Sequence, residues 1–327
     1  MKKLLTFLLL FPLFGYAHPG IAIVQDSKGT IYYSDLTQVW KIINGIKSIV
    51  IPNVHTHELY IDTEDNLYGE HLEYKGEASN KFEHYLWVLR PNGNLDTLIN
   101  PRQAYMKFDY SLARDMEGNE YFIKQFLEQP DTNHIIKKLK SGKEIIIATG
   151  SFTAVNWLHP QKNGSLLYVV NNDVYKIDAS GKVHVIAENI RNETQSFKNY
   201  GHDATVWGVW QDVAENIYVA VYSDQLVKKI TTNGVVSDYY RSTDNWAPTH
   251  GLFDAKNQLW LLEFSDKNET RVILAHPSIT TKEIKKSVAF LPLLLIGIGI
   301  LGWLVYWIYK MKKRKHEETP SQNMGIT

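Results

Sequence analysis

The sequence lacks cysteine altogether, so no disulfide can stabilise the fold and no lipid can be attached through a cysteine. It also lacks a net charge, because 35 Lys and Arg residues balance 35 Asp and Glu residues, and no long charged block occurs before residue 310. Nucleic-acid binding needs a concentrated basic face to neutralise phosphates. We therefore expect no nucleic acid among the main partners.

Long apolar runs are also scarce, and the two that occur lie near the ends of the sequence. Residues 1–17, MKKLLTFLLLFPLFGYA, combine two lysines, a short apolar run and small residues before a cleavage position, which is the pattern of a signal peptide. Residues 287–309 contain no charged residue and would span a bilayer as one helix, and KMKKRK follows them. The expected order is signal peptide, exported domain, linker (281–286), transmembrane helix (287–309) and basic cytoplasmic tail (310–327).

This topology places the exported domain in the periplasm, anchored to the inner membrane by the C-terminal helix. A eukaryotic single-pass protein would carry the same signals, so the host stays open.

One turn pattern recurs six times in the exported part. It consists of an aspartate (a glutamine in the fourth copy), a polar turn with Gly or Asn, and an apolar strand whose seventh position is usually aromatic. The six copies begin 36 to 53 residues apart and read DSKGTIYYSD (26–35), DTEDNLYGEH (62–71), DMEGNEYFIK (115–124), QKNGSLLYVV (161–170), DVAENIYVAV (212–221) and DAKNQLWLLE (254–263). A repeat of this length with several strands per unit is typical of a β-propeller.

Each of the first five units also contains a second hairpin, marked by an Asn-Gly or Ser-Gly pair that supplies the positive φ of a tight turn. These pairs begin at Asn44, Asn92, Ser141, Ser180 and Asn233. Four strands in each of six units predict an all-β fold, a six-bladed β-propeller over residues 18–280, followed by the single transmembrane α-helix. In the sixth unit the segment RVILAHPSITTKEI lacks a glycine turn. The sequence does not indicate which strands close the ring.

The segment HPGIAIVQDSKGTIYYSD (18–35) resembles an NHL repeat, and the chain is similar more broadly to the propeller group that includes gluconolactonase-like and strictosidine-synthase-like proteins. The resemblance implies the fold but no single function. Gluconolactonase-like enzymes hold a divalent ion with a Glu of the first blade and Asn and Asp residues of others. Here the first unit has no Glu at that place, and Glu58 lies one unit later.

In a propeller the start of the first strand and the end of the second strand lie on one face near the axis, so these positions should converge on one funnel. They carry polar, ionisable or aromatic residues: His57, Glu58, His202, Trp207, Trp246 and His250 from first strands, and Asp35, Glu70, His71, Lys124, Asn171 and Glu263 from second strands. Such a group is typical of a ligand site. His55 and His84 fall outside the pattern and are expected on the surface or in loops.

Several interpretations of the histidines stay open. His57, His202 and His250 could share one divalent ion, zinc through imidazoles or calcium with added carboxylates, or could be solvated or structural residues. Without a metal, His57 or His250 could act as a general base. The identity of any cofactor is not readable.

Three functions fit this sequence. The first is a membrane-anchored propeller that binds a small ligand or a protein partner through the funnel. The second is a divalent-metal-dependent hydrolase or lyase acting on a lactone, ester or sugar at the same place. The third is a structural partner of another membrane protein.

Overall fold

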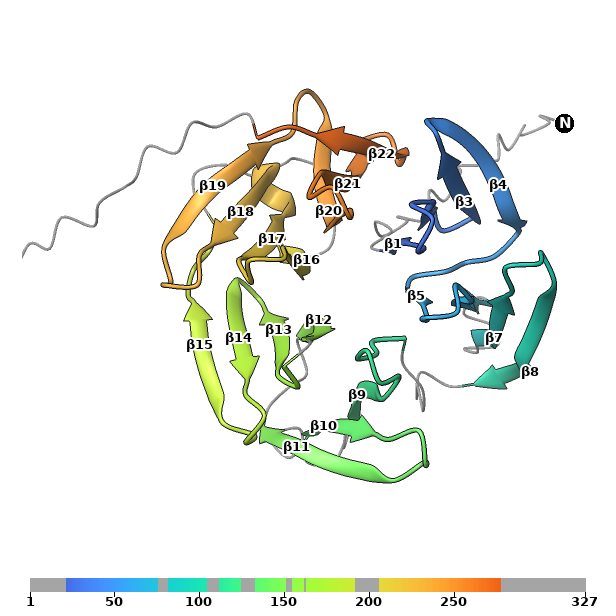
Figure 1. Ribbon diagram of the computed structural model, residues 1–327, viewed down its shortest axis with the longest axis horizontal. Coiled ribbons are helices and arrows are strands. Elements are labelled where there is room, and N and C mark those ends of the chain that lie inside the picture. Colours follow the sequence, from blue (N-terminus) through green and yellow to red (C-terminus); the bar gives the residue numbers. More distant parts are fainter. Residues whose placement is uncertain are drawn as a thin grey trace, which may run out of the picture. The chain divides into compact units, whose positions relative to one another are not determined.

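The computed structural model describes residues 22–75, 82–104, 112–124, 133–150, 155–161, 163–191 and 206–277. The chain divides into two compact units, Met1–Thr281 and Lys282–Thr327, and the described residues all belong to the first. They form six antiparallel sheets arranged around one axis (Figure 1). The expected all-β six-bladed propeller is therefore confirmed.

The expected signal peptide and membrane anchor lie outside the described residues. Among the residues that are described, no helix is long and apolar enough to cross a membrane.

Within each blade the strands are numbered in chain order, which runs from the axis outwards. Blade 1 contains β1 (Ile23–Gln25), β2 (Ile31–Ser34), β3 (Gln38–Ile43) and β4 (Ile46–Pro52), and blade 2 contains β5 (Leu59–Ile61), β6 (Leu67–Tyr74), β7 (Phe82–Leu89) and β8 (Leu95–Ala104). Blade 3 contains β9 (Glu120–Lys124), β10 (Asn133–Lys138) and β11 (Glu144–Gly150), and an isolated bridge between Arg114 and Glu120 takes the inner position.

The second half of the ring follows the same order. Blade 4 contains β12 (Val155–Pro160), β13 (Leu166–Val170), β14 (Asp173–Ile177) and β15 (Val183–Ala187), and blade 5 contains β16 (Val206–Gln211), β17 (Ile217–Val221), β18 (Leu226–Ile230) and β19 (Val236–Arg241). The described part of blade 6 contains β20 (Trp246–Phe253), β21 (Leu259–Ser265) and β22 (Thr270–Ala275). A short 3₁₀ helix, Tyr222–Asp224, joins β17 to β18.

Packing of blade 1 against blade 6 closes the ring. The innermost strands β1 and β20 lie beside each other next to the axis (Figure 1). Ile23, Ile31 and Tyr33 of blade 1 share one buried cluster with Leu262 of blade 6. Closure therefore includes burial of apolar surface between blades 1 and 6, a favourable term that grows with the area removed from water.

The repeated aspartate organises each first turn. In blade 5, Asp212 accepts hydrogen bonds from the backbone N–H groups of Ala214 and Asn216 and from the hydroxyl of Tyr218, each at 2.9 Å. The pattern recurs for the pairs Asp26–Tyr32, Asp62–Tyr68, Asp115–Tyr121 and Asp254–Trp260, where the indole N–H is the donor. The aromatic seventh position of the repeat is thus explained by a hydrogen bond back to the turn.

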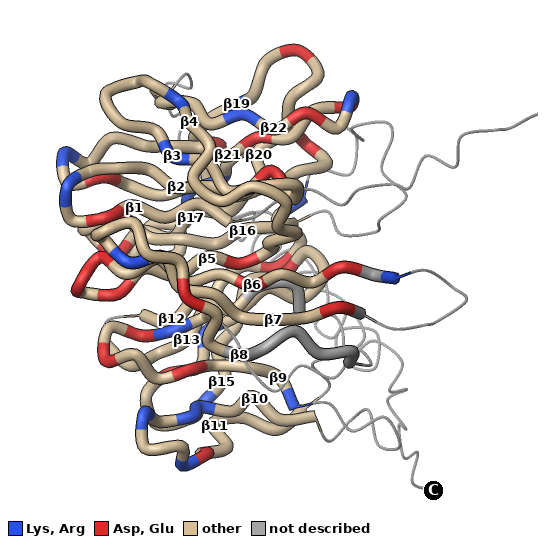
Figure 2. The backbone as a smooth tube through the Cα atoms, turned by 90° about the vertical axis from the view of Figure 1, so that its right-hand side faces the viewer, with Lys and Arg blue, Asp and Glu red and all other residues tan. Residues whose placement is uncertain are grey.

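These hydrogen bonds also lower the pKa of turn aspartates. Burial by itself would raise the pKa of Asp62 and Asp115, but the hydrogen bonds from Asn66 and Asn119, among others, outweigh it and lower the pKa below the ordinary value. The charged residues of both signs are interspersed along the described turns and strands (Figure 2).

We expect the substitution Asp115→Ala to destabilise the propeller by about 2–4 kcal/mol, because it removes the acceptor of several buried donors at once. The Tyr121 hydroxyl, bonded at 2.9 Å, would lose this acceptor, and so would the Asn119 side chain, which keeps only its bond to Glu117. Lys137, whose Nζ lies 3.1 Å from the carboxylate, would lose its ion pair. Urea unfolding of the purified protein measures the loss.

Asp96→Ala is the matched control, because Asp96 is exposed and its ion pair, with Arg90 at 3.0 Å, lies at the surface, where the two side chains are 53% and 41% exposed. It should change stability by no more than about 0.5 kcal/mol. Equal losses in both variants would show that the turn aspartate has no special role.

Candidate functional site

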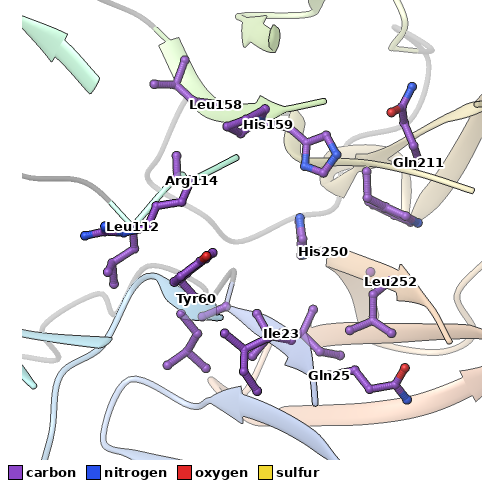
Figure 3. A pocket seen from close by; sticks show the side chains of 18 of the residues that line it. Ile23, Gln25, Tyr60, Leu112, Arg114, Leu158, His159, Gln211, His250 and Leu252 are labelled. Carbon is purple, nitrogen blue, oxygen red and sulfur yellow. The ribbon is translucent and has the colours of Figure 1, made fainter. Parts of the chain in front are cut away.

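A cavity of about 420 Å³ lies on the propeller axis. All six blades line it through the last residues of their inner segments, just before the aspartate turns (Figure 3). The polar lining residues are Gln25, Tyr60, Arg114, His159, Trp210, Gln211 and His250, and the rest of the wall is largely apolar, including Ile23, Leu112, Leu158 and Leu252. Its volume is in the range of small-molecule sites.

Two histidines face each other across this cavity. The ring of His250, on β20, points toward His159, on β12 (Figure 3). Burial lowers the pKa of His159 to about 4, and burial together with the nearby His159 ring lowers the pKa of His250 to about 3. Both imidazoles are therefore neutral at pH 7, and each can donate one hydrogen bond and accept another.

Two glycines leave the space that the rings of His250 and Trp210 occupy. A Cβ at Gly208 of β16 would lie 2.4 Å from Cδ2 of His250, and a Cβ at Gly251 of β20 would lie 2.7 Å from Cζ2 of Trp210. The glycine of each strand thus leaves space for an aromatic ring of the other strand. The two rings pack with centroids 5.5 Å apart.

Arg114, the one Lys or Arg among the described residues of the cavity wall, is compensated. Arg114 pairs with Glu120 at 2.9 Å, and its guanidinium lies over the ring of Tyr60, 5.6 Å from the centroid. With Arg114 paired and both histidines neutral, the described residues of the lining carry no uncompensated charge. Such a wall favours uncharged molecules, because a buried ion without a partner is strongly unfavourable.

A second group of ionisable residues lies in blade 2, at the opposite ends of the inner strands. We call it the blade-2 cluster: His55, His57, Glu58, Glu70 and His71. Nδ1 of His57 lies 3.3 Å from Oε1 of Glu70, the backbone N–H of His55 donates to Nδ1 of His71 at 3.1 Å, and the rings of His55 and His57 are 4.7 Å apart. Pairing of β5 with β6 brings these residues together, as the repeat geometry predicts for His57, Glu58, Glu70 and His71.

Glu58 has a strongly perturbed carboxyl group. Burial, and next to it the negative charge of Glu70, raise the pKa of Glu58 to about 7. Its Oε2 accepts the backbone N–H of Leu112 at 3.0 Å, and Leu112 also lines the central cavity. A carboxyl group with this pKa exchanges protons near neutral pH, as acid–base catalysis requires.

Three other predicted funnel residues make local contacts. Asp35 accepts hydrogen bonds from the backbone of Thr37 and Gln38 and from the indole of Trp40, so it stabilises its own hairpin. Lys124 is exposed and reaches Glu144 of the outer strand β11 at 3.2 Å. Asn171 has φ +53° and forms the tight turn between β13 and β14.

The remaining predicted residues pack within blades 5 and 6. Glu263 is fully buried, pairs with Arg271 at 2.7 Å and accepts a hydrogen bond from Ser242. The Arg271 guanidinium lies 4.1 Å from the ring centroid of Trp246. Trp207 packs against Tyr222 with Ala247 and Phe264.

The expected metal ligands are not assembled among the described residues. His202 lies outside them, His57 belongs to the blade-2 cluster, and His250 lines the cavity. No group of three or more His, Asp or Glu that could hold a metal ion occurs in the described ranges. We therefore assign no chemical step to a metal. A pKa of about 3 also makes His250 a weak base at neutral pH.

The structure corrects the expectation for His84, places His55 in a loop as expected but within the blade-2 cluster, and adds His159 to the site. His55 is part of the blade-2 cluster, and His84 is buried in β7 because the β6–β7 ladder extends further than the repeat pattern indicates. His159 lies two residues before the turn of blade 4, at the end of a first strand, whereas the funnel residues were predicted from the starts of first strands and the ends of second strands. The corresponding positions of blades 2 and 5 carry Tyr60 and Trp210, and this alignment could have identified the cavity wall.

Comparison with known proteins identifies the fold alone. No protein-family model and no curated protein matches the chain. An auxiliary nutrient-binding protein from Bacteroides ovatus is 12% identical, with 79% of this chain and 70% of that chain covered and a TM-score of 0.52. A candidate gluconolactonase is 13% identical, with 78% and 90% covered and a TM-score of 0.52. The calcium-binding protein regucalcin from Agrobacterium tumefaciens is 13% identical, with 75% and 81% covered and a TM-score of 0.50.

The raised pKa of Glu58 predicts a specific pH dependence of stability. Between about pH 4.5, the ordinary value, and pH 7 the folded protein binds a proton at Glu58 that the unfolded chain has released. The contribution of this residue to stability therefore falls as pH rises through that window. Glu58→Gln should flatten the decline and stabilise the protein at pH 8 by about 1–3 kcal/mol.

Unfolding measured from pH 4 to pH 8 checks this expectation, with Glu188→Gln, an exposed glutamate, as control. An unchanged pH profile in Glu58→Gln would contradict the assigned burial of this carboxyl group.

Proposed function

We propose that this protein binds a small uncharged molecule in the central cavity. The observation that carries the proposal is the cavity itself, a space of about 420 Å³ with two neutral histidines and a paired arginine in its wall. The apolar side chains supply the hydrophobic contact, and the few polar groups supply orientation. Auxiliary nutrient-binding proteins among the propellers of similar fold are compatible with this role.

We further propose that the propeller is displayed outside the cytoplasm on the anchor formed by residues 287–309, after removal of residues 1–17. The support is the sequence, with one uncharged segment of bilayer length followed by a basic flank. In this arrangement the cavity would sample small molecules at the membrane surface.

The proposal is tested with benzyl alcohol as an uncharged probe and benzoate and benzylammonium as charged analogues of similar size. Benzyl alcohol should raise the melting temperature of the purified protein in a concentration-dependent way, because it binds only the folded state. The charged analogues should not, since the cavity offers no counter-charge. Binding of either ion as strong as that of the alcohol would contradict the proposal.

His159→Phe is the variant that locates the site, because phenylalanine keeps the ring volume and removes both hydrogen-bonding atoms. We expect it to weaken benzyl alcohol binding by about 5–10-fold, the equivalent of one hydrogen bond of about 1 kcal/mol. His134→Phe, on β10 away from the cavity lining, is the control. Equal affinities in the two variants would place the probe elsewhere.

A hydrolase or lyase is the second candidate, and the observation that favours it is Glu58. A carboxyl group protonated near pH 7 beside Glu70 and His57 can donate a proton to a leaving oxygen while its neighbours accept one from water. The substrates to test are 4-nitrophenyl esters and glycosides.

If this candidate is correct, Glu58→Gln should reduce kcat by about 10²–10⁴-fold, since glutamine cannot donate that proton, with Glu188→Gln as control. Turnover that survives the substitution would exclude Glu58 as the acid.

A further inference from the structure

The residue directly before each first turn has the same place in all six blades. We call these six residues the turn-side ring: Gln25, Ile61, Arg114, Pro160, Gln211 and Phe253. All six line the cavity, and all six are half-buried, neither enclosed in the core nor fully exposed. Each blade thus contributes one equivalent, partly accessible residue to the cavity wall.

The strand register shows where the backbone of this ring points. In every blade the next residue donates its backbone N–H across the hairpin, as Asp212 does to the Asn216 carbonyl at 3.1 Å. Bonded and non-bonded residues alternate along an antiparallel strand, so Gln211 is a non-bonded residue. Its N–H and C=O point away from β17. Because β16 is the innermost strand of its sheet, they point toward the axis, where the cavity lies (Figure 1).

Pro160 independently supports this orientation. Proline has no backbone N–H and occurs in sheets at edge positions where no ladder hydrogen bond is lost. It occupies the ring position of blade 4, opposite Leu166 in the β12–β13 ladder. The sheet therefore does not use the N–H of a ring residue.

Axis-facing backbone groups are within reach of a partner. Leu112, two residues before Arg114, has the same orientation, and its N–H donates to Oε2 of Glu58 of the neighbouring blade at 3.0 Å. Within the described residues, no backbone group donates to the Gln211 carbonyl or accepts the Gln211 N–H. Backbone N–H and C=O are strong hydrogen-bonding groups, so those of Gln211 are available to a molecule in the cavity.

Gln211 also lies between the two histidines of the cavity. Its strand β16 packs between β12, which carries His159, and β20, which carries His250 (Figures 1 and 3). Both rings are neutral at pH 7 and can donate or accept a hydrogen bond. A molecule held by the Gln211 backbone would therefore have further uncharged polar partners close by.

On the basis of the proposed binding function, we propose that the backbone of Gln211 holds an amide group of the bound molecule. An extended residue presents a donor and an acceptor on the same side, as it does in strand pairing. A primary amide or a lactam carries the complementary acceptor and donor side by side, whereas an ester or a ketone offers the acceptor alone. The ligand class is an uncharged amide whose apolar body packs against the largely apolar wall.

Benzamide and acetophenone test this proposal, because they have nearly the same size and shape. Both carbonyl oxygens can accept the Gln211 N–H, but only benzamide can also donate to the Gln211 carbonyl. We expect the full-length protein to bind benzamide about 5–10-fold more tightly in isothermal titration calorimetry, the equivalent of one hydrogen bond. Equal affinities would overturn the amide class.

Gln211→Pro removes the backbone N–H without removing a ladder hydrogen bond, as Pro160 does naturally in blade 4. We expect it to weaken the binding of both probes by about 5–10-fold. Gln211→Ala is the matched control, because it removes the side chain and keeps the N–H, and it should change neither affinity by more than about two-fold. Equal losses in the two variants would assign the contact to the side chain and overturn the role of the backbone.

A resonance shift decides the question if the proline variant does not fold. In the protein labelled with ¹⁵N-glutamine, Gln211→Ala identifies the Gln211 backbone resonance by removing it. Benzamide should move this amide proton downfield. The resonance of Gln161, whose N–H already bonds the Ser165 carbonyl at 2.8 Å, should stay in place. An unmoved Gln211 resonance at saturating benzamide would overturn the proposal.

These outcomes separate the amide contact from the binding function. Binding of benzyl alcohol, with no preference for benzamide and no shift at Gln211, would overturn the amide contact alone. Binding of none of the three probes would overturn the binding function as well.

Discussion

The hydrogen bonds of the turn aspartate are the interaction on which the rest of this propeller depends. In five of the six blades one carboxylate accepts two backbone N–H groups and the polar hydrogen of an aromatic residue six positions later. This fixes the reversal from the first strand to the second. The cavity wall is built from the residues directly before these aspartates, such as Gln25, Arg114 and Gln211, so the turn also fixes where the cavity-lining side chains lie. In blade 4 the aspartate is replaced by Gln161, which accepts a hydrogen bond from Ser165.

The two ends of the axis share one electrostatic principle, because burial favours the neutral form of every titratable group. It lowers the pKa of His159 and His250 in the cavity and raises the pKa of Glu58 in the blade-2 cluster. The consequences differ. The cavity becomes a neutral, largely apolar space suited to holding an uncharged molecule, whereas the cluster keeps a proton that can be exchanged near neutral pH. Leu112 touches both regions, through its backbone N–H to Glu58 and through the cavity wall.

The repeat pattern predicted part of the site and missed another part for a definite reason. Strand pairing within a hairpin is local, so the meeting of His57 with Glu70 could be predicted from the turn between them. The position of His250 depends on two glycines in different blades, Gly208 and Gly251, whose missing side chains let β16 and β20 approach. No hairpin rule contains that information. The same packing buries the Trp210 ring against residues of blade 6, a feature that only the assembled blades reveal.

The sequence by itself determined the number of blades and the places of the aspartate turns, because each of these turns is held by hydrogen bonds between residues at most six positions apart. Which side chains meet at the propeller axis was decided only by the tertiary structure. Residues such as Tyr60, His159 and His250 come from different blades, and whether they meet depends on how neighbouring sheets pack. Packing between sheets is set by the volumes of side chains distant in the sequence, and a repeat of turns and strands does not encode it.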